Sequence, residues 1–290
     1  MSMAESRAIQ VRMSSVAEAL AHIDAYDRTG GDKVAWELSR TATLARLRVL
    51  VRNPDLLNQR GLNACGPAAF FRVWLARDPL AVATYGCDML SRGSARIGQR
   101  VIAAGWKLRA QNYANMRTAV DGAHPNVTPE HADWMLLTSL RDSENSVLDY
   151  NGEPFTLAET VAGITLPGTL AGWLKDTGVF PSPKDDTQFT PSADPAPLLR
   201  AIPTSDSETI LLINSDVLGV WLTRPKTPPE GKLSLFSIPN HYVLLTGPFA
   251  LSGDGAWLNI DVWTWGRSER GWVGLQRFGS GYYGMLTAKT

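Results

Sequence analysis

The 290-residue sequence has only two cysteines, Cys65 and Cys87. Two thiols cannot build the disulfide framework of a small secreted domain or supply the four cysteines of a structural zinc site. The formal net charge is zero, because 28 basic residues are balanced by 28 acidic ones. Without a basic excess the chain lacks the general attraction for phosphate that nucleic-acid binders use. We expect no disulfide framework and no nucleic-acid partner, which leaves a reactive thiol as the feature to examine.

Long hydrophobic runs are also missing. No stretch reaches the roughly 18 apolar residues of a membrane-spanning helix, and residues 1–15 lack the apolar centre of a secretory signal. We therefore expect no membrane span and a chain that is cytoplasmic as synthesised. Secretion or injection by a route without a signal peptide would leave no trace in these features.

Hydrophobic residues make up 44% of the chain, enough to bury a large core. Through the first two thirds they recur at steps of three and four, which is typical of helices. After residue 207 short apolar runs separated by Gly, Pro, Asn and Asp favour strands. Helices are expected directly after Cys65 and over residues 14–51, 79–91, 95–110, 129–143 and 156–176. Strands are expected over residues 209–213, 218–223, 241–246, 257–263 and 271–278.

The same change in composition divides the chain and predicts an α+β fold. A helical lobe is expected over residues 51–180 and a β lobe over 208–290, joined by a proline-rich connector over 181–207. Residues 1–50 form a helical extension that can serve as a partner, adaptor or regulatory surface.

Cys65 has the sequence setting of a nucleophile. It lies between small residues, and Pro67 is acceptable in the first turn of the helix that follows. Because a thiol attacks as its thiolate, the positive end of a helix should lower the pKa of Cys65. A buried core cysteine is the simpler interpretation of the position. Cys87 has no such setting and is expected to be packed in the core.

Acyl chemistry at Cys65 also needs an oxyanion donor and a base. Gln59, six residues earlier, can supply an amide N–H beside the backbone N–H of Cys65, and Asn63 is a second candidate donor. Among the four histidines only His241 begins an apolar strand, which would hold the imidazole at a fixed place.

Asp261 is the candidate that would orient His241. Two-residue alternation over residues 257–263 puts Asp261 on the face opposite to the apolar side chains, among several tryptophans. A carboxylate there can accept from the second ring nitrogen and steady the imidazolium. A solvated strand residue is the alternative interpretation.

The order Gln59, Cys65, His241, Asp261 resembles the papain-like cysteine peptidase superfamily. Residues 240–247 (NHYVLLTG) look like its histidine strand, and residues 260–266 (IDVWTWG) like the strand of its third catalytic residue. Asp replaces the Asn of papain, and the chain lacks papain's disulfides. The pattern is more similar to bacteriocin-processing peptidases and to bacterial effector or toxin enzymes.

The resemblance implies a helical lobe packed on an antiparallel β lobe, with the active cleft between them. It implies a cysteine hydrolase that acts on a protein or peptide amide through Cys65, His241 and Asp261, without a metal or other cofactor. Deamidase, transglutaminase-like and acyl-transferase activities on the same triad remain open, and so does a catalytically inactive binding module. Weaker candidates for substrate contacts are Gly66, Asn240 and Trp263, and an immunity, chaperone or secretion-adaptor protein is a candidate partner.

Overall fold

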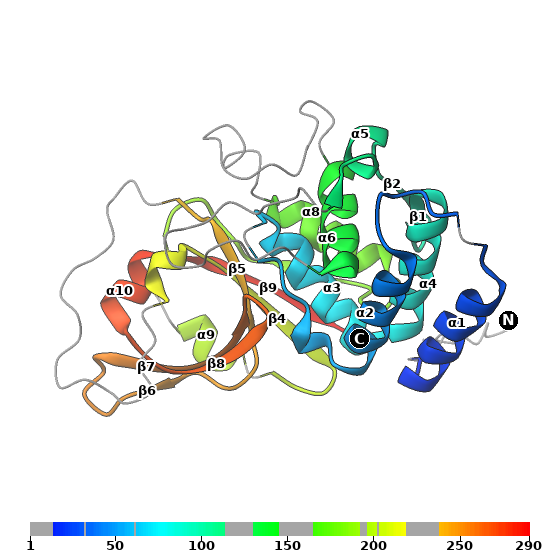
Figure 1. The fold of residues 1–290 in the computed structure, drawn as a ribbon. Helices are drawn as coiled ribbons and strands as arrows, with labels where there is room; N and C mark the ends of the chain where they lie inside the picture. The colour runs from blue at the N-terminus through cyan, green and yellow to red at the C-terminus, as the bar shows by residue number, and fades with distance from the viewer. Residues whose placement is uncertain are drawn as a thin grey trace, which may run out of the picture.

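The structure, a computed structural model, combines a group of helices with an antiparallel sheet (Figure 1). The described residues are 14–31, 33–60, 62–113, 130–144, 165–191, 196–201, 203–218 and 238–290. Their helices are α1 (Val16–Thr29), α2 (Arg40–Arg52), η1 (Pro54–Leu56), α3 (Cys65–Arg77), α4 (Pro79–Arg92), α5 (Trp106–Arg109), α6 (His131–Ser143), α8 (Pro167–Asp176), α9 (Ala196–Arg200), η3 (Ser215–Val217) and α10 (Leu275–Ser280).

The strands fall into a small hairpin and one larger sheet. The hairpin pairs β1 (Ser94–Ile97) with β2 (Arg100–Ala103). The larger sheet contains β3 (Lys184–Asp185), β4 (Ser207–Ile213), β5 (His241–Leu245), β6 (Ala250–Leu251), β7 (Trp257–Thr264), β8 (Arg267–Gly274) and β9 (Tyr282–Lys289). Its order is β3-β9-β4-β5-β7-β6, with β8 also paired to β7, and all its pairs are antiparallel.

Local sequence signals explain where several helices begin and end. Ser15 and Glu18 form a capping box at the start of α1, which satisfies backbone N–H groups that have no partner within the helix. Asp78 caps α4, and Pro79 takes the first position of that helix. Gly93 ends α4 with a φ of 70°, in the left-handed region that favours glycine.

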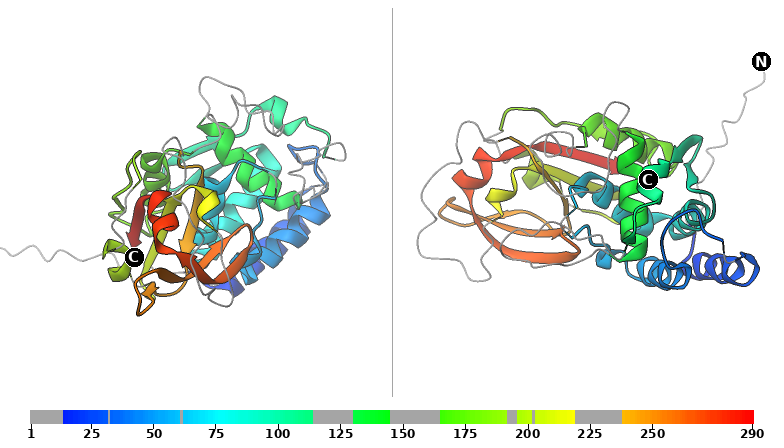
Figure 2. Two further views of the ribbon diagram at one scale, coloured as in Figure 1. Left: turned by 90° about the vertical axis from the view of Figure 1, so that its left-hand side faces the viewer. Right: turned by 45° about the horizontal axis from the view of Figure 1, so that its top comes forward.

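The central strands are buried on both faces, which explains their continuous apolar sequences. Alternate residues of β4 and β5, among them Leu212 and Leu244, pack in the same hydrophobic cluster as the helices. The intervening residues, among them Leu211 and Val243, pack in a second cluster with β7, β8, α9 and α10. Figure 1 and the right-hand view of Figure 2 place most of the helices on one side of the molecule and the curved sheet, with α9 and α10, on the other.

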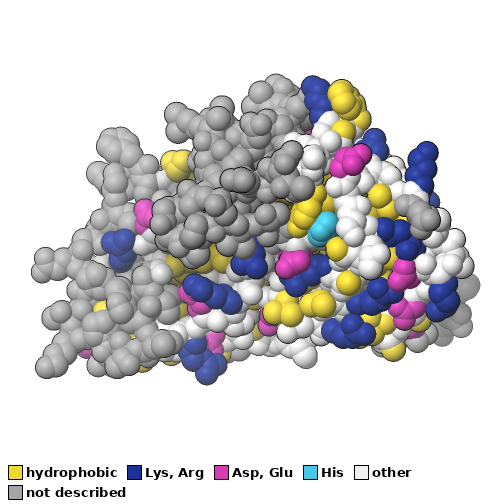
Figure 3. All heavy atoms as spheres, viewed as in Figure 1, with side chains coloured by type: hydrophobic (Ala, Val, Ile, Leu, Met, Phe, Trp, Pro, Cys, Tyr) yellow, Lys and Arg dark blue, Asp and Glu magenta, His cyan; other side chains and the backbone are white. Residues whose placement is uncertain are grey.

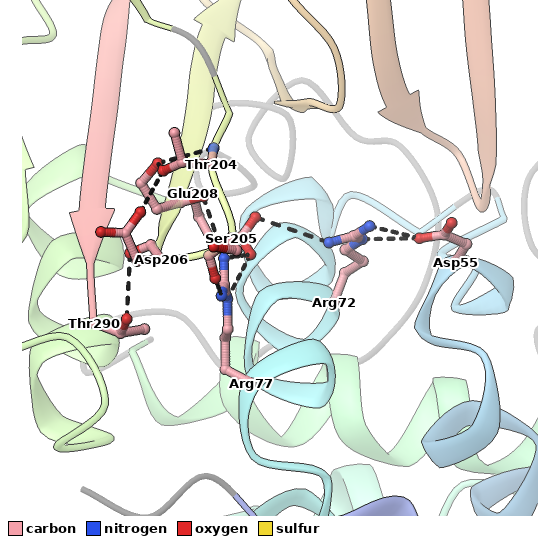
Figure 4. A network of polar contacts seen from close by, with 9 residues as sticks. Asp55, Arg72, Arg77, Thr204, Ser205, Asp206, Glu208 and Thr290 are labelled. Carbon is pink, nitrogen blue, oxygen red and sulfur yellow. Dashed lines mark hydrogen bonds and ion pairs between the residues drawn. The ribbon is translucent and has the colours of Figure 1, made fainter. Parts of the chain in front are cut away.

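Ion pairs attach α3 to the β4 end of the sheet (Figure 4). Arg77 reaches Glu208 at 2.7 Å and also donates to the carbonyl oxygens of Ser205 and Ser207. Arg72, one turn earlier, reaches Asp55 at 2.8 Å. The helix that begins at Cys65 is therefore tied to β4 and to η1.

The described part of residues 1–50 packs into the helical group. Ala19 and Ile23 of α1 and Leu44 and Leu47 of α2 are fully buried in the cluster that also contains Cys65. A partner role for this segment stays a prediction. On the face shown in Figure 3, basic and acidic side chains lie next to one another over the helical part. None of the described helices is long and apolar enough to cross a membrane.

Most expected elements are present, but two expectations need correction and one strand was missed. The helix expected over residues 95–110 is the β1–β2 hairpin followed by the short α5, because Gly98 turns the chain with a φ of 54°. The strand expected over 271–278 ends at Gly274 and continues as α10. Strand β9 was not expected at all. All but Leu218 of the strand expected over 218–223, and the first part of the helix expected over 156–176, fall outside the described residues.

Candidate active site

Cys65 is the first residue of α3 and is 7% exposed. Among the described residues, none caps this end of the helix with its side chain. The Cys65 sulfur lies 3.7 Å from the carbonyl oxygen of Asn240, directly before the histidine strand. The start of α3 and the start of β5 therefore lie close together at the Cys65 sulfur, although they are far apart in the sequence.

Gly66 lets the chain pass close to the segment before α8. A Cβ at this position would lie within 2.4 Å of the side chain of Thr165. Thr165 is held in turn, because its carbonyl oxygen accepts from the hydroxyl of Tyr242 at 2.8 Å. The first turn of α3 is thus fixed between β5 and the start of α8. Gly66 serves a packing role here, and its predicted contact with substrate stays a prediction.

His241 is buried at the first position of β5. Its Nε2 lies 2.7 Å from the hydroxyl oxygen of Thr264 on β7. The ring of Trp265 stacks on the imidazole, with centroids 4.5 Å apart and planes 17° apart. Within the part of the chain that the structure describes, one ring nitrogen and one ring face are thus occupied, which leaves Nδ1 as the nitrogen that can act as a base.

Gln59 is buried in the loop between η1 and α3. Its side-chain oxygen accepts from the backbone N–H of Ala64 at 3.2 Å. Because the oxygen is used, the amide has its NH₂ group left to donate. This arrangement fits the predicted oxyanion donor.

Gln59, Cys65 and His241 line the same pocket. Its lining consists of Gln59, Cys65, Ala68, His241, Tyr242, Trp263, Trp265 and Gly266. Its volume is about 10 Å³, the space of about one water molecule. Gln59, Cys65 and His241 thus line one pocket, which lies where the start of α3 meets β5 and the end of β7.

Asp261 lies elsewhere, and its predicted role is wrong for this structure. Its two carboxylate oxygens each accept from Arg270 at 2.7 Å. Asp261 and Thr264 are three residues apart on β7, so their side chains leave opposite faces of the strand. The pairing of Leu245 with Val262 puts Thr264 on the face of His241. The residue that contacts the imidazole is therefore Thr264.

Burial governs the protonation of both candidate catalytic groups. It raises the pKa of the Cys65 thiol, against smaller opposing effects of backbone hydrogen bonds and of Arg141. Burial also lowers the pKa of His241 to about 4. The expectation that the helix start lowers the pKa of Cys65 is therefore wrong for this structure. At neutral pH the pair is a thiol beside an uncharged imidazole.

The other candidate residues have structural partners. The side-chain oxygen of Asn240 accepts from the backbone N–H of Ser215 at 2.7 Å, and the indole of Trp263 donates to the carbonyl oxygen of Asp55 at 2.9 Å. Trp263 also lines the pocket. Asn63 is half-buried in the turn before α3 and does not line the pocket, so Gln59 is the better placed of the two candidate oxyanion donors.

Sequence reasoning missed Thr264 and Trp265. Both lie in the Trp-Thr-Trp-Gly stretch that carried part of the resemblance, but the resemblance assigned the orienting role to Asp261, two residues before this stretch. The signal that could have found them is the turn itself. A two-residue hairpin after Thr264 ends the strand beside the start of β5, where the imidazole lies.

Comparisons of the chain with protein-family models, with curated proteins and with solved structures find no match.

Proposed function

We propose that the chain is a cysteine hydrolase that acts on an amide of a protein or peptide. The observation that carries this proposal is the pocket at which Gln59, Cys65 and His241 meet from three separate segments. A sulfur nucleophile, an imidazole with one free nitrogen and an amide donor are the groups that acyl transfer through a thioester requires. The papain-like arrangement, with the cleft between helical and β lobes, belongs to the same proposal.

The reaction begins with the neutral pair. As the Cys65 sulfur adds to the substrate carbonyl carbon, Nδ1 of His241 accepts the thiol proton. The carbonyl oxygen becomes an oxyanion, which the Gln59 amide and the backbone N–H of Cys65 stabilise. His241 then returns the proton to the departing amine, and a thioester remains on Cys65. Water hydrolyses the thioester with His241 again as the base.

A buried neutral pair is compatible with this chemistry because the proton moves during attack. In the tautomer that carries the proton on Nε2, the hydroxyl of Thr264 accepts Nε2–H and Nδ1 is free to act as the base. The stacked ring of Trp265 keeps water from one face of the imidazole. The pocket is narrow, so a substrate carbonyl enters only if the hairpin tip or the Gln59 loop moves.

The test is formation of the thioester with p-nitrophenyl acetate. We expect a burst of p-nitrophenol from the wild-type protein and one added acetyl group on Cys65 by intact-protein and peptide mass spectrometry. Cys65→Ala should abolish both while the protein stays folded. Cys87→Ala is the matched control, since this cysteine is buried in the core and its pKa is raised to about 12. An equal burst from Cys65→Ala would contradict the proposal.

The substrate class within this chemistry is decided by its products. A peptidase creates new termini in a target protein, whereas a deamidase changes one Gln or Asn side chain to an acid and leaves the backbone intact. Mass spectrometry of a target separates the two. An effector role in another cell, with an immunity or adaptor partner, stays part of the proposal.

A catalytically inactive binding module is the second candidate. The raised pKa of Cys65 and the lowered pKa of His241 favour it, because they oppose a preformed thiolate–imidazolium pair. For this function we expect no acetyl-enzyme from the wild-type protein, and Cys65→Ala should leave partner binding unchanged.

A further inference from the structure

We propose that Asp133, together with Arg46, positions Gln59 as the oxyanion donor. This inference rests on the proposed function and adds two positioning residues to it. Neither residue lines the pocket. Both act through the loop that carries Gln59, which joins η1 to α3.

Asp133 of α6, which is buried, forms an ion pair with the half-buried Arg46 of α2. The carboxylate is fully buried and accepts from the guanidinium at 2.7 and 3.0 Å. A buried carboxylate is costly unless its remaining lone pairs are also satisfied. A further lone pair of the Asp133 carboxylate accepts a hydrogen bond from the backbone N–H of Asn58 at 2.7 Å.

Arg46 holds the same loop at a second point. Its guanidinium donates to the carbonyl oxygen of Leu56 at 2.6 Å. The ion pair thus holds the two peptide groups that flank Leu57: Arg46 binds the carbonyl oxygen of Leu56, and Asp133 binds the N–H of Asn58. Gln59 is the next residue along the chain. Charge-assisted hydrogen bonds of this kind are stronger than neutral ones and fix direction as well as distance.

The loop needs such support because its backbone turns sharply after Gln59. Arg60 has a φ of 53°, in the left-handed region that non-glycine residues rarely adopt. The side-chain oxygen of Asn58 accepts from the backbone N–H of Arg60 at 2.8 Å and closes this turn. Holding Asn58 therefore determines where the chain places Gln59.

Asn58 also connects the loop to the histidine side of the pocket. Its side chain packs against Gly266, where a Cβ would lie 2.7 Å from that of Asn58. Gly266 follows Trp265, whose ring stacks on His241. One fixed residue therefore sets the oxyanion donor on one wall of the pocket and supports the hairpin tip on the other.

The experiment compares two reactions of Cys65 that differ in their need for an oxyanion site. Acetylation by p-nitrophenyl acetate forms a thioester through an oxyanion, with p-nitrophenolate as the leaving group. Alkylation by iodoacetamide displaces iodide and forms no oxyanion. For Asp133→Asn we expect acetylation about 10- to 100-fold slower, the effect of a misplaced catalytic group, and alkylation within about twofold of wild type. Arg46→Lys keeps the charge but loses the two-pronged contact, and should change in the same direction.

Three further variants show whether the effect of Asp133→Asn acts through Gln59. Gln59→Ala should slow acetylation at least as much as Asp133→Asn, and the double variant should be no slower than Gln59→Ala alone. Asp27→Asn is the matched control, because Asp27 joins an ion pair with Arg40 and Arg48 of α2 that does not contact the loop. It should leave both rates unchanged.

The outcomes separate the two proposals. Equal slowing of acetylation and alkylation in Asp133→Asn and Arg46→Lys, or effects of Asp133→Asn and Gln59→Ala that multiply, would overturn the positioning role alone. If Asp133→Asn does not fold, Arg46→Lys carries the same comparison. If Gln59→Ala leaves acetylation unchanged, the oxyanion site itself fails, and this inference fails with it.

Discussion

The hydroxyl of Thr264 lies 2.7 Å from Nε2 of His241, at the place where a carboxylate or amide would orient a catalytic histidine. A hydroxyl can accept Nε2–H and fix the tautomer, but it brings no negative charge. The imidazolium formed during catalysis therefore gains less stabilisation than beside a carboxylate. This agrees with the lowered pKa of His241, for which burial is the cause.

Replacing Thr264 by valine tests the orienting contact. Valine keeps the branched shape but removes the acceptor, so the buried Nε2–H loses its partner and the other tautomer becomes accessible. We expect kcat/KM for an acyl substrate to fall about 10- to 100-fold, in the range of general acid–base contributions. Thr264→Ser keeps the hydroxyl, so its kcat/KM should stay close to that of the wild-type protein.

Asp261→Asn is the informative control. The Asp261 side chain faces Arg270, which is largely exposed, so its loss should change stability by less than about 1 kcal/mol and leave kcat/KM near wild type. A large loss of activity in Asp261→Asn together with a small one in Thr264→Val would restore the triad expected from the sequence.

His241 should make the folded state sensitive to mild acid. Its pKa is lowered from 6.5 to about 4, so between these values the unfolded chain binds a proton that the folded chain does not. The stabilisation that comes from a neutral His241 is fully present above pH 6.5 and is lost as the pH falls towards about 4. The total loss is about 3 kcal/mol at 1.4 kcal/mol for each pH unit.

Urea unfolding at a series of pH values measures this effect. We expect the free-energy difference between wild type and His241→Asn to shrink by about that amount as the pH falls through this window, and to stay constant above pH 7. Taking the difference removes the contribution of His131, whose pKa is also lowered. Parallel curves for the two proteins would mean that His241 titrates normally in the folded state.

The sequence predicted the parts of the site that depend on local signals. Cys65 at a helix start, Gln59 a short loop before it and His241 at a strand start are each readable from a few neighbouring residues. Composition and periodicity also indicated the change from helices to strands, but only the resemblance implied that these three residues meet in one cleft.

The partner of His241 was not readable in the same way. Alternation correctly separates the two faces of β7, but it does not tell which residue of β7 lies beside which residue of β5. The observed register pairs Leu244 with Trp263, which brings Thr264 rather than Asp261 to the imidazole. Register depends on the turn and on the packing of both faces, and these are properties of the folded sheet. The pKa values depend on burial, which is equally non-local.

Trp265 combines an unfavourable backbone with a contact to the base. It forms the two-residue turn between β7 and β8 with Gly266, and their φ values are 47° and 76°. Turns of this geometry favour Asn-Gly, and a tryptophan in the left-handed region is strained. Such strain persists where the surroundings require it and is frequent at functional sites. The stacking of the indole on His241 accounts for a tryptophan at this strained position.

Trp265→Asn therefore tests whether function maintains this residue. The turn should become less strained while the stacking is lost, so we expect the free energy of unfolding to change by less than about 1 kcal/mol. The rate of acetylation should nevertheless fall at least about tenfold, because the imidazole loses the ring that holds its plane and limits water access. Urea unfolding and the p-nitrophenol burst measure the two effects. Trp106→Asn, at an exposed tryptophan of α5, is the control and should change neither. An unchanged burst in Trp265→Asn would show that the indole does not help to position His241.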